Sequence, residues 1–352
     1  MSETQKHTKP NVPNLRFPGF EGEWKEKTIG DILSIGNGSD YKHLSSGPIP
    51  VFGTGGKLAE VEGYIYEGET VCIGRKGTIN KPFYYNGRFW TVDTLFYTYG
   101  FSQVLPKFVL YLFERINWIK YNEASGVPSL SKKTIEAILV NVPTQEEQII
   151  ISDCLSLIDE RISIQNKVIE RYESLIKALA YEIIGQKVPN TLLSDLVSCA
   201  SSSLKESDLS ETGDIPTYGA AGLSGYTEQC LSEKESILIT KDGSGVGSMR
   251  YVSGRHSFVG TLNSLTPKEG IYLPYVYYAL LNVNFEAYRT GQAIPHIYFK
   301  DYGKEGIYCP AYEDQVKLAK GLELIDVRIE HEKAVLQGLQ TIKVYMLSAL
   351  FI

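Results

Sequence analysis

The sequence lacks the residue patterns that mark several common active sites. It contains no Gly-x-x-x-x-Gly-Lys-Ser/Thr loop for nucleoside triphosphates and no nucleophile elbow. It also lacks the Asn/Asp-Pro-Pro-aromatic segment of adenine methyltransferases, because the nearest stretch, NKPF at 80–83, has a single proline. Its five histidines form no cluster with metal-ligand spacing. We therefore expect neither catalytic residues nor a bound metal in this chain.

Cysteines and long apolar runs are also scarce. No apolar run approaches the roughly 20 residues that a membrane-spanning helix needs. The polar start of the chain, MSETQKHTKPNVPN, lacks the apolar stretch of a signal peptide. The composition therefore predicts a reduced, cytoplasmic protein without disulfides or a membrane segment. The five cysteines are scattered and include no Cys-x-x-Cys pair: Cys72, Cys154, Cys199, Cys230 and Cys309.

An excess of positive charge is missing as well. The net charge is −6, whereas a nucleic-acid-binding protein usually has a basic surface. If this chain binds DNA, we expect its own affinity to be modest. Partner subunits would then neutralise many of the phosphates.

The chain does contain an internal repeat, with a period of about 166 residues. A period this long indicates two whole domains rather than a stack of small units. The matching segments are IPVFGTGG (49–56) with IPTYGAAG (215–222), VCIGRKG (71–77) with ILITKDG (237–243), VPTQEEQ (142–148) with CPAYEDQ (309–315), and LSLIDERI (155–162) with LELIDVRI (322–329). The last two segments match well, whereas the rest agrees only at glycines, prolines and apolar runs. We infer one architecture with two different specificities.

Each copy divides into a body and a tail. The bodies contain glycine-bounded, strand-like runs and one helical pattern each, at 105–117 and 273–288. This predicts domains of the mixed α/β (α+β) class. The expected boundaries are a first body at 1–143 with a disordered lead at about 1–14, a central helix at 144–187, a second body at 188–310 and a C-terminal helix at 311–352.

The tails have the heptad pattern of a coiled coil. The predicted seam consists of Leu155, Ile162, Ile169, Ile176 and Ile183 in the first tail and of Leu322, Ile329, Leu336 and Leu350 in the second. Since a lone helix cannot bury such a stripe, we expect the two tails to pack as an antiparallel coiled coil with a pseudo-twofold axis. Gln165 and Glu332 occupy one equivalent polar seam position, either to fix the register or to face solvent. Lys343 interrupts the seam, and we expect Ile342 to cover for it.

Several loops have residues suited to contact with DNA. Their small residues allow close approach of a backbone, and Arg or Lys can bind guanine edges or phosphates. Tight turns with solvated side chains are the alternative. The charged turn GRKG of one copy is TKDG in the other, so these loops share no catalytic set. The candidate residues are Thr54, Lys57, Arg75, Lys76, Thr78, Ser125, Ser129, Ser131 and Lys132 in the first body, and Lys241, Ser244, Gln292, His296 and Lys300 in the second.

Four segments together resemble the specificity subunit of type I restriction–modification systems. They are LRFPGFEGEW (15–24), GRKGTIN (74–80), SGVPSLSKKTIEAILVNVPTQEEQ (125–148) and the LxLIDxRI of both tails. CPAYEDQ departs from the family form at the second junction but keeps its Pro and Gln. The resemblance covers nearly the whole chain.

The resemblance implies two target recognition domains that each read one half of a bipartite, asymmetric sequence in double-stranded DNA, with the helices setting the gap. It implies no cofactor in this chain. Two methyltransferase subunits holding S-adenosylmethionine would dock on it, and restriction–translocase subunits using ATP and Mg would join them. Two alternatives stay open: a recognition region detached from a fused methyltransferase–nuclease, and a two-headed scaffold that does not bind DNA.

Overall fold

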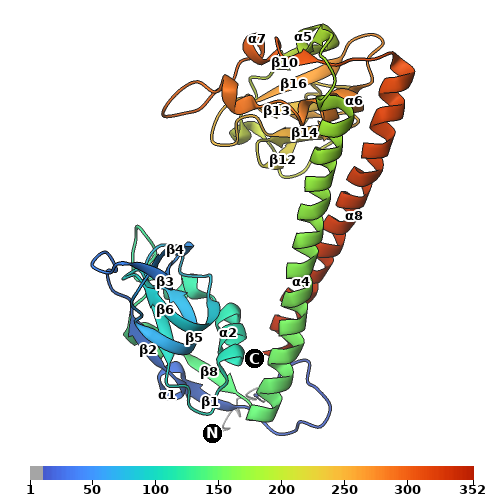
Figure 1. Cartoon of the computed structure of the whole chain (residues 1–352). Coiled ribbons are helices and arrows are strands. Elements are labelled where there is room, and N and C mark those ends of the chain that lie inside the picture. Colours follow the sequence, from blue (N-terminus) through green and yellow to red (C-terminus); the bar gives the residue numbers. More distant parts are fainter. Residues whose placement is uncertain (1–10) are drawn as a thin grey trace. The chain divides into compact units, whose positions relative to one another are not determined.

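The computed structural model describes residues 11–352 and divides into two compact units (Figure 1). The first unit contains the described part of Met1–Gln165 together with Val335–Ile352, and the second contains Asn166–Ala334. Each unit therefore combines one body with a part of both long helices. Residues 1–10 of the predicted lead lie outside the described residues.

The first body is built on a six-stranded sheet with the order β2-β7-β5-β6-β3-β4. Neighbouring strands are antiparallel except β3 and β6, which run parallel with Val51 opposite Trp90. The strands are β2 (Ser34–Asn37), β3 (Ser46–Gly53), β4 (Gly56–Val61), β5 (Tyr66–Gly74), β6 (Phe83–Thr91) and β7 (Leu95–Tyr99). The other elements are α1 (Ile29–Ile32), α2 (Pro106–Arg115), η1 (Trp118–Tyr121), α3 (Lys132–Glu136) and the antiparallel pair β1 (Lys25–Thr28) and β8 (Leu139–Val142).

The core of this body lies between the sheet and α2. Pro106 starts the helix, where its missing N–H costs no hydrogen bond. The apolar face of α2 places Phe108 and Phe113 in one buried cluster with Val71 and Ile73 of β5. Burying side chains of this size contributes about 1.5–3 kcal/mol each. The helix predicted at 105–117 is therefore present, with slightly shorter bounds.

The second body repeats this topology with two separate sheets, in the orders β10-β16-β13-β14 and β12-β11-β15. β11 pairs antiparallel with β12 and parallel with β15, as β3 does with β4 and β6. The strands are β9 (Thr191–Leu192), β10 (Val197–Ser201), β11 (Ile215–Gly219), β12 (Gly222–Thr227), β13 (Ser236–Thr240), β14 (Met249–Val252), β15 (Ser257–Phe258), β16 (Leu262–Pro267) and β17 (Gly306–Ile307). The helices are α5 (Leu193–Leu196), η3 (Glu206–Asp208), α6 (Leu273–Leu280), η4 (Phe285–Tyr288) and α7 (Phe299–Tyr302).

Both bodies thus belong to the mixed α/β class that the sequence predicted. The single helix expected at 273–288 is wrong in its length, because α6 ends at Leu280 and a separate 3-10 turn begins at Phe285. The sequence between them, LNVN, supplies two asparagines, whose side chains compete with helical backbone bonds.

The tails form α4 (Gln145–Ala180), which continues into the π turn η2 (Tyr181–Gly185), and α8 (Tyr312–Leu350). In each unit the two helices lie side by side (Figure 1). They run antiparallel in the first unit, where the end of α8 packs near the start of α4. They also do so in the second, where Lys333 approaches Glu173. Six seam residues are buried: Leu155, Ile169, Ile176, Leu322, Ile329 and Leu350. Three are partly buried: Ile162, Ile183 and Leu336.

The polar residues of the predicted seam, Gln165, Glu332 and Lys343, differ in their surroundings. Glu332 is buried and its carboxylate lies 2.5 Å from the guanidinium of Arg328, so it does not face solvent. Gln165 is partly buried. The expectation that Ile342 covers the seam at Lys343 is wrong, because Ile342 is half exposed.

Lys343 itself fills the seam by ion pairing. Its ammonium group lies 2.7 Å from Asp159 of α4 and 2.8 Å from Glu114 of α2, and it approaches the ring of Tyr111. Burial would lower the pKa of Lys343, but the two carboxylates outweigh that effect and raise it. The lysine therefore ties three helices of the first unit together.

The segment before β1 is packed, so the predicted disorder does not extend to residues 11–14. The carbonyl of Asn11 accepts a hydrogen bond from the Trp24 amide at 2.8 Å, and the Leu15 amide donates to Ala349 at 2.8 Å. Arg16 makes two bonds of 2.8 Å to the buried carboxylate of Glu147, at the start of α4. The segment 15–24 therefore connects the first body to both long helices through these hydrogen bonds.

Candidate nucleic-acid interface

The first candidate site begins at the turn that follows β5. The amides of Arg75 and Lys76 both donate to the carbonyl of Thr94, at 2.8 and 3.2 Å. Gly77 completes the turn with a φ of +85°, a conformation that favours glycine. Backbone bonds therefore hold the turn, and the Arg75 guanidinium adds a long bond of 3.4 Å to the carbonyl of Asp93.

A second predicted segment, 125–132, lies against this turn. The Gly77 amide donates to Pro128 at 2.8 Å, and the Leu130 amide donates to Arg75 at 2.9 Å. Lys76 and Ser129 face each other in an antiparallel bridge. The β3–β4 loop is also near, because a Cβ at Gly77 would lie 3.8 Å from the hydroxyl of Thr54. Three separately predicted segments thus meet at one place.

The second body has the same backbone frame. The Gly243 amide donates to Pro295 at 3.0 Å, and the Ile297 amide donates to Lys241 at 2.9 Å. The amides of Lys241 and Asp242 donate to Thr261, at 2.9 and 3.3 Å. Each bond has its counterpart in the first body, although the two loops share few residues. The frame is therefore a property of the repeat.

The side chains on the frame differ between the bodies. Where the first body pairs Lys76 with Ser129, the second pairs Asp242 with His296. Nδ1 of His296 lies 3.1 Å from the Asp242 carboxylate, and both side chains are about one-third exposed (35% and 37%). Lys76 is exposed. One scaffold therefore presents a cation and a hydroxyl in one copy, and an imidazole and a carboxylate in the other.

Several of the predicted contact residues are engaged within their own body. The Arg75 guanidinium lies 5.8 Å from the centre of the Phe96 ring. The Ser131 hydroxyl caps α3 by accepting from the Thr134 amide at 3.1 Å. Three lysines contact nearby side chains: Lys57 with Glu60, Lys132 with Glu136, and Lys300 with the Tyr298 ring.

The other predicted DNA-contact residues differ in how exposed their side chains are. Ser125, Ser244 and Gln292 are exposed, whereas Thr78 and Lys241 are partly buried. Within residues 11–352, the side chains of these five make no hydrogen bond or ion pair.

Arg250 was missed by the sequence reasoning. It is exposed on β14, and its guanidinium would lie 3.3 Å from a Cβ at Gly222, in the loop that matches GTGGK. It also lines a small cavity with Gly219, Thr240 and Ser248. The sequence shows only that Arg250 follows the 240–248 turn, and its approach to the loop at Gly222 is visible only in the fold.

The best-matched part of the repeat is the junction between body and helix. The Gln148 side chain accepts from the Leu105 amide at 2.8 Å and donates to Pro143 at 3.1 Å. Gln315 makes the corresponding bonds to Tyr272 and Pro310, both at 2.9 Å.

The tyrosines of α2 and α6 repeat this equivalence. Tyr111 bonds to Asp159 at 3.0 Å, and Tyr278 bonds to Asp326 at 2.6 Å. The matched residues of the repeat therefore anchor each body to its long helix.

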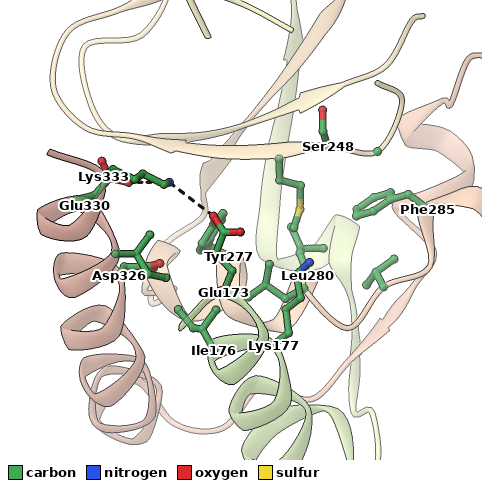
Figure 2. Close-up of a pocket in the computed structure, with 15 residues that line it drawn as sticks. Glu173, Ile176, Lys177, Ser248, Tyr277, Leu280, Phe285, Asp326, Glu330 and Lys333 are labelled. Carbon is green, nitrogen blue, oxygen red and sulfur yellow. Dashed lines mark hydrogen bonds and ion pairs between the residues drawn. The ribbon is translucent and has the colours of Figure 1, made fainter. Parts of the chain in front are cut away.

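A cavity of about 460 Å³ lies in the second unit, between the body and the two helices (Figure 2). Three of its charged groups pair with one another, since Lys333 lies 3.1 Å from Glu330 and 3.9 Å from Glu173. Burial raises the pKa of Asp326, against the hydrogen bond from Tyr278. These contacts describe a helix–body junction.

No group of three or more His, Cys, Asp or Glu in residues 11–352 is placed to hold a metal ion. Within the same range, every helix is too short or too polar to span a bilayer.

Known proteins are similar to this chain in both sequence and fold. The family model for the type I restriction modification DNA specificity domain matches twice, at residues 21–173 and 193–341. A putative type I specificity subunit of Mycoplasma genitalium is 27% identical over 232 residues, which span 59% of this chain and 60% of that protein. A putative type I restriction enzyme specificity subunit of Haemophilus influenzae is 23% identical over 341 residues, or 87% of this chain and 88% of that protein.

Two solved structures have the same fold. The crystal structure of a type I restriction–modification S subunit from M. genitalium aligns with a TM-score of 0.64 at 20% identity, over 97% of this chain and 99% of that one. A chain from a study of complex assembly in a type I system aligns with a TM-score of 0.51 at 14% identity, over 95% and 97%. With its two matches to the family model, this chain belongs to the type I restriction modification DNA specificity family.

Proposed function

We propose that this chain is the specificity subunit of a type I restriction–modification complex, in which each body reads one half of a bipartite, asymmetric DNA site. One observation carries the proposal. The two bodies hold the same backbone frame, with Gly77 and Gly243 bonded to equivalent prolines, yet present different side chains on it. A shared scaffold with exchanged donor and acceptor groups is suited to reading different base edges.

The long helices support a role for two identical partners. Leu157 and Leu324 occupy the same position of the repeat and are 61% and 74% exposed. An exposed leucine within the best-matched segment of each unit is a natural anchor for one protein bound twice. We infer that two methyltransferase subunits dock here, and that restriction–translocase subunits join the complex.

The chemistry would then lie in those partners. The chain itself would be non-catalytic and would hold no cofactor, with S-adenosylmethionine, ATP and Mg bound by the other subunits. Because its net charge is −6, the partner subunits would also have to neutralise much of the DNA charge. We infer that it acts on DNA in the cytoplasm, a compartment in which its five cysteines would stay reduced.

Selection from a randomised duplex pool tests the proposal. The full chain, with and without a type I methyltransferase subunit, is incubated with the pool, and bound DNA is sequenced. A gapped two-part motif enriched by the complex is the expected result. Methyl transfer by the chain alone would favour a detached enzyme fragment, and no enrichment even in complex would favour a non-DNA scaffold.

A paired substitution tests the docking surface separately. Leu157→Asp with Leu324→Asp should abolish co-purification of the methyltransferase subunit while leaving the far-UV circular dichroism unchanged. Leu139→Asp is the matched control, because Leu139 is also 61% exposed but lies on β8, outside the helices. Equal loss of the partner in both variants would contradict the assignment.

A further inference from the structure

Each loop of the repeated frame exposes one branched aliphatic side chain. Val127 is 68% exposed and Ile294 is 60% exposed. Both directly precede the proline whose carbonyl accepts a bond from the facing turn, Pro128 from Gly77 and Pro295 from Gly243. The two residues therefore occupy one equivalent place beside the two candidate sites.

Val127 and Ile294 differ from ordinary surface side chains because they occupy equivalent positions in both copies of the repeat. Single exposed aliphatic residues are common and need no explanation. These two loops, however, share little else, since the main match between SGVPSLS and TGQAIPHIY is a β-branched residue followed by proline. An exposed aliphatic residue retained in two otherwise divergent loops points to contact with something outside the chain.

The local backbone fixes the direction of both side chains. A residue before proline is restricted to extended conformations, and a β-branched side chain has few χ1 rotamers. The following proline is held in place by its bond to the turn. On the other side of Val127, a Cβ at Gly126 would meet nothing within 4 Å. Val127 is thus a rigid apolar projection two residues from Ser129, which faces Lys76.

DNA offers one apolar group to such a projection in its major groove, the C5-methyl of thymine. The other known apolar role, a wedge that unstacks a base step, uses mostly longer side chains. Valine is shorter than these, and Ile294 occupies the place equivalent to Val127, so we expect one role for both. Ser129 and His296, each two residues further on, are suited to base edges. We propose that Val127 and Ile294 each contact the methyl group of one thymine, one in each half-site. This inference rests on the proposed function.

Uracil substitution tests the contact because it removes only the methyl group. The full chain in complex with methyltransferase subunits is bound to its selected duplex, and each thymine is replaced by uracil in turn. One thymine in each half-site should show a roughly fourfold loss of affinity, the value for one buried methyl group. In Val127→Ala the sensitivity at one of these thymines should disappear while the other stays. Ile294→Ala should do the reverse.

Val188→Ala is the matched control. Val188 is 82% exposed and also precedes a proline, but it lies in the linker before β9. It should leave both uracil effects unchanged. Because all three side chains are exposed, unchanged thermal unfolding is expected in each variant.

Three results would overturn the inference. The wild-type complex could bind all uracil duplexes equally, or Val127→Ala and Ile294→Ala could keep the full uracil effects. Enhanced 2-aminopurine fluorescence that is lost in Val127→Ala, without any methyl dependence, would assign a wedge instead. These outcomes differ from failure of the proposed function, in which the complex binds no specific duplex at all.

Discussion

Replacing Lys343 by methionine should destabilise the first unit without affecting the second. Methionine keeps the apolar stem in the seam and removes only the ammonium group. The carboxylates of Asp159 and Glu114, which lie 2.7 and 2.8 Å from that group, would lose their shared partner. Burial already raises the pKa of Glu114, against the lowering effect of Lys343.

The stability lost in Lys343→Met should lie between the values for a buried and for an exposed ion pair. Removing one partner of a buried pair costs about 3–5 kcal/mol, and an exposed pair contributes about 0.2–1 kcal/mol. The side chain of Lys343 is 18% exposed, but Glu114 and Asp159 are 23% and 34% exposed and regain some hydration. We therefore expect the free energy of unfolding to fall by about 2–3 kcal/mol.

Urea unfolding at pH 7 measures this loss. All three tryptophans, Trp24, Trp90 and Trp118, lie in the first unit, so their fluorescence follows that unit alone while circular dichroism follows the whole chain. Lys333→Met is the control, because Lys333 is 47% exposed and its pairs are 3.1 and 3.9 Å long. It should cost about 0.5 kcal/mol or less.

The effect of pH gives a second criterion. Lys343 lowers the pKa of Glu114, so losing it raises that pKa further, and Glu114 of the variant is protonated more readily as the pH falls. The stability difference from wild type should therefore narrow toward pH 4. Equal losses for both lysine variants, or a loss for Lys343→Met that does not change with pH, would refute the ion-triad explanation.

Two further changes test other contacts. Arg16→Met should lower the free energy of unfolding by about 3 kcal/mol, because Glu147 is 1% exposed and would keep an unpaired charge. In urea unfolding, adding Glu147→Gln to this variant should restore most of the lost stability. No recovery would argue against the Arg16–Glu147 pair. Lys76→Ala should alter the base preference in one half-site only, as expected if Lys76 reads a base edge. Equal weakening for all duplexes, with a salt slope reduced by about 1, would instead assign Lys76 to a phosphate. His296→Ala should alter the preference for one half-site only, measured by selection from a randomised pool.

Local patterns predicted much of the fold. The heptad pattern of apolar residues predicted both long helices. It did so because residues such as Leu155 and Leu322, which are buried, recur at a spacing that places them on one face of a helix. The glycine-bounded turns were also predictable, since Gly77 and Gly243 adopt backbone conformations that favour glycine.

Contacts between distant segments could not be predicted in the same way. The partners of Lys343 lie on two other helices, so no local pattern predicts an ion triad there. Ser131 was predicted as a DNA contact from its residue type, yet a cap at the start of α3 accounts for its hydroxyl. The meeting of Lys76 with Ser129 likewise depends on how the chain returns to the turn.

Exchange of one body tests the central claim most directly. Residues 190–308 are replaced by the corresponding segment of another family member, and the complex with methyltransferase subunits selects DNA from a randomised pool. If the bodies read independently, one half of the enriched motif changes while the other half and the gap remain. A change in both halves would contradict the account.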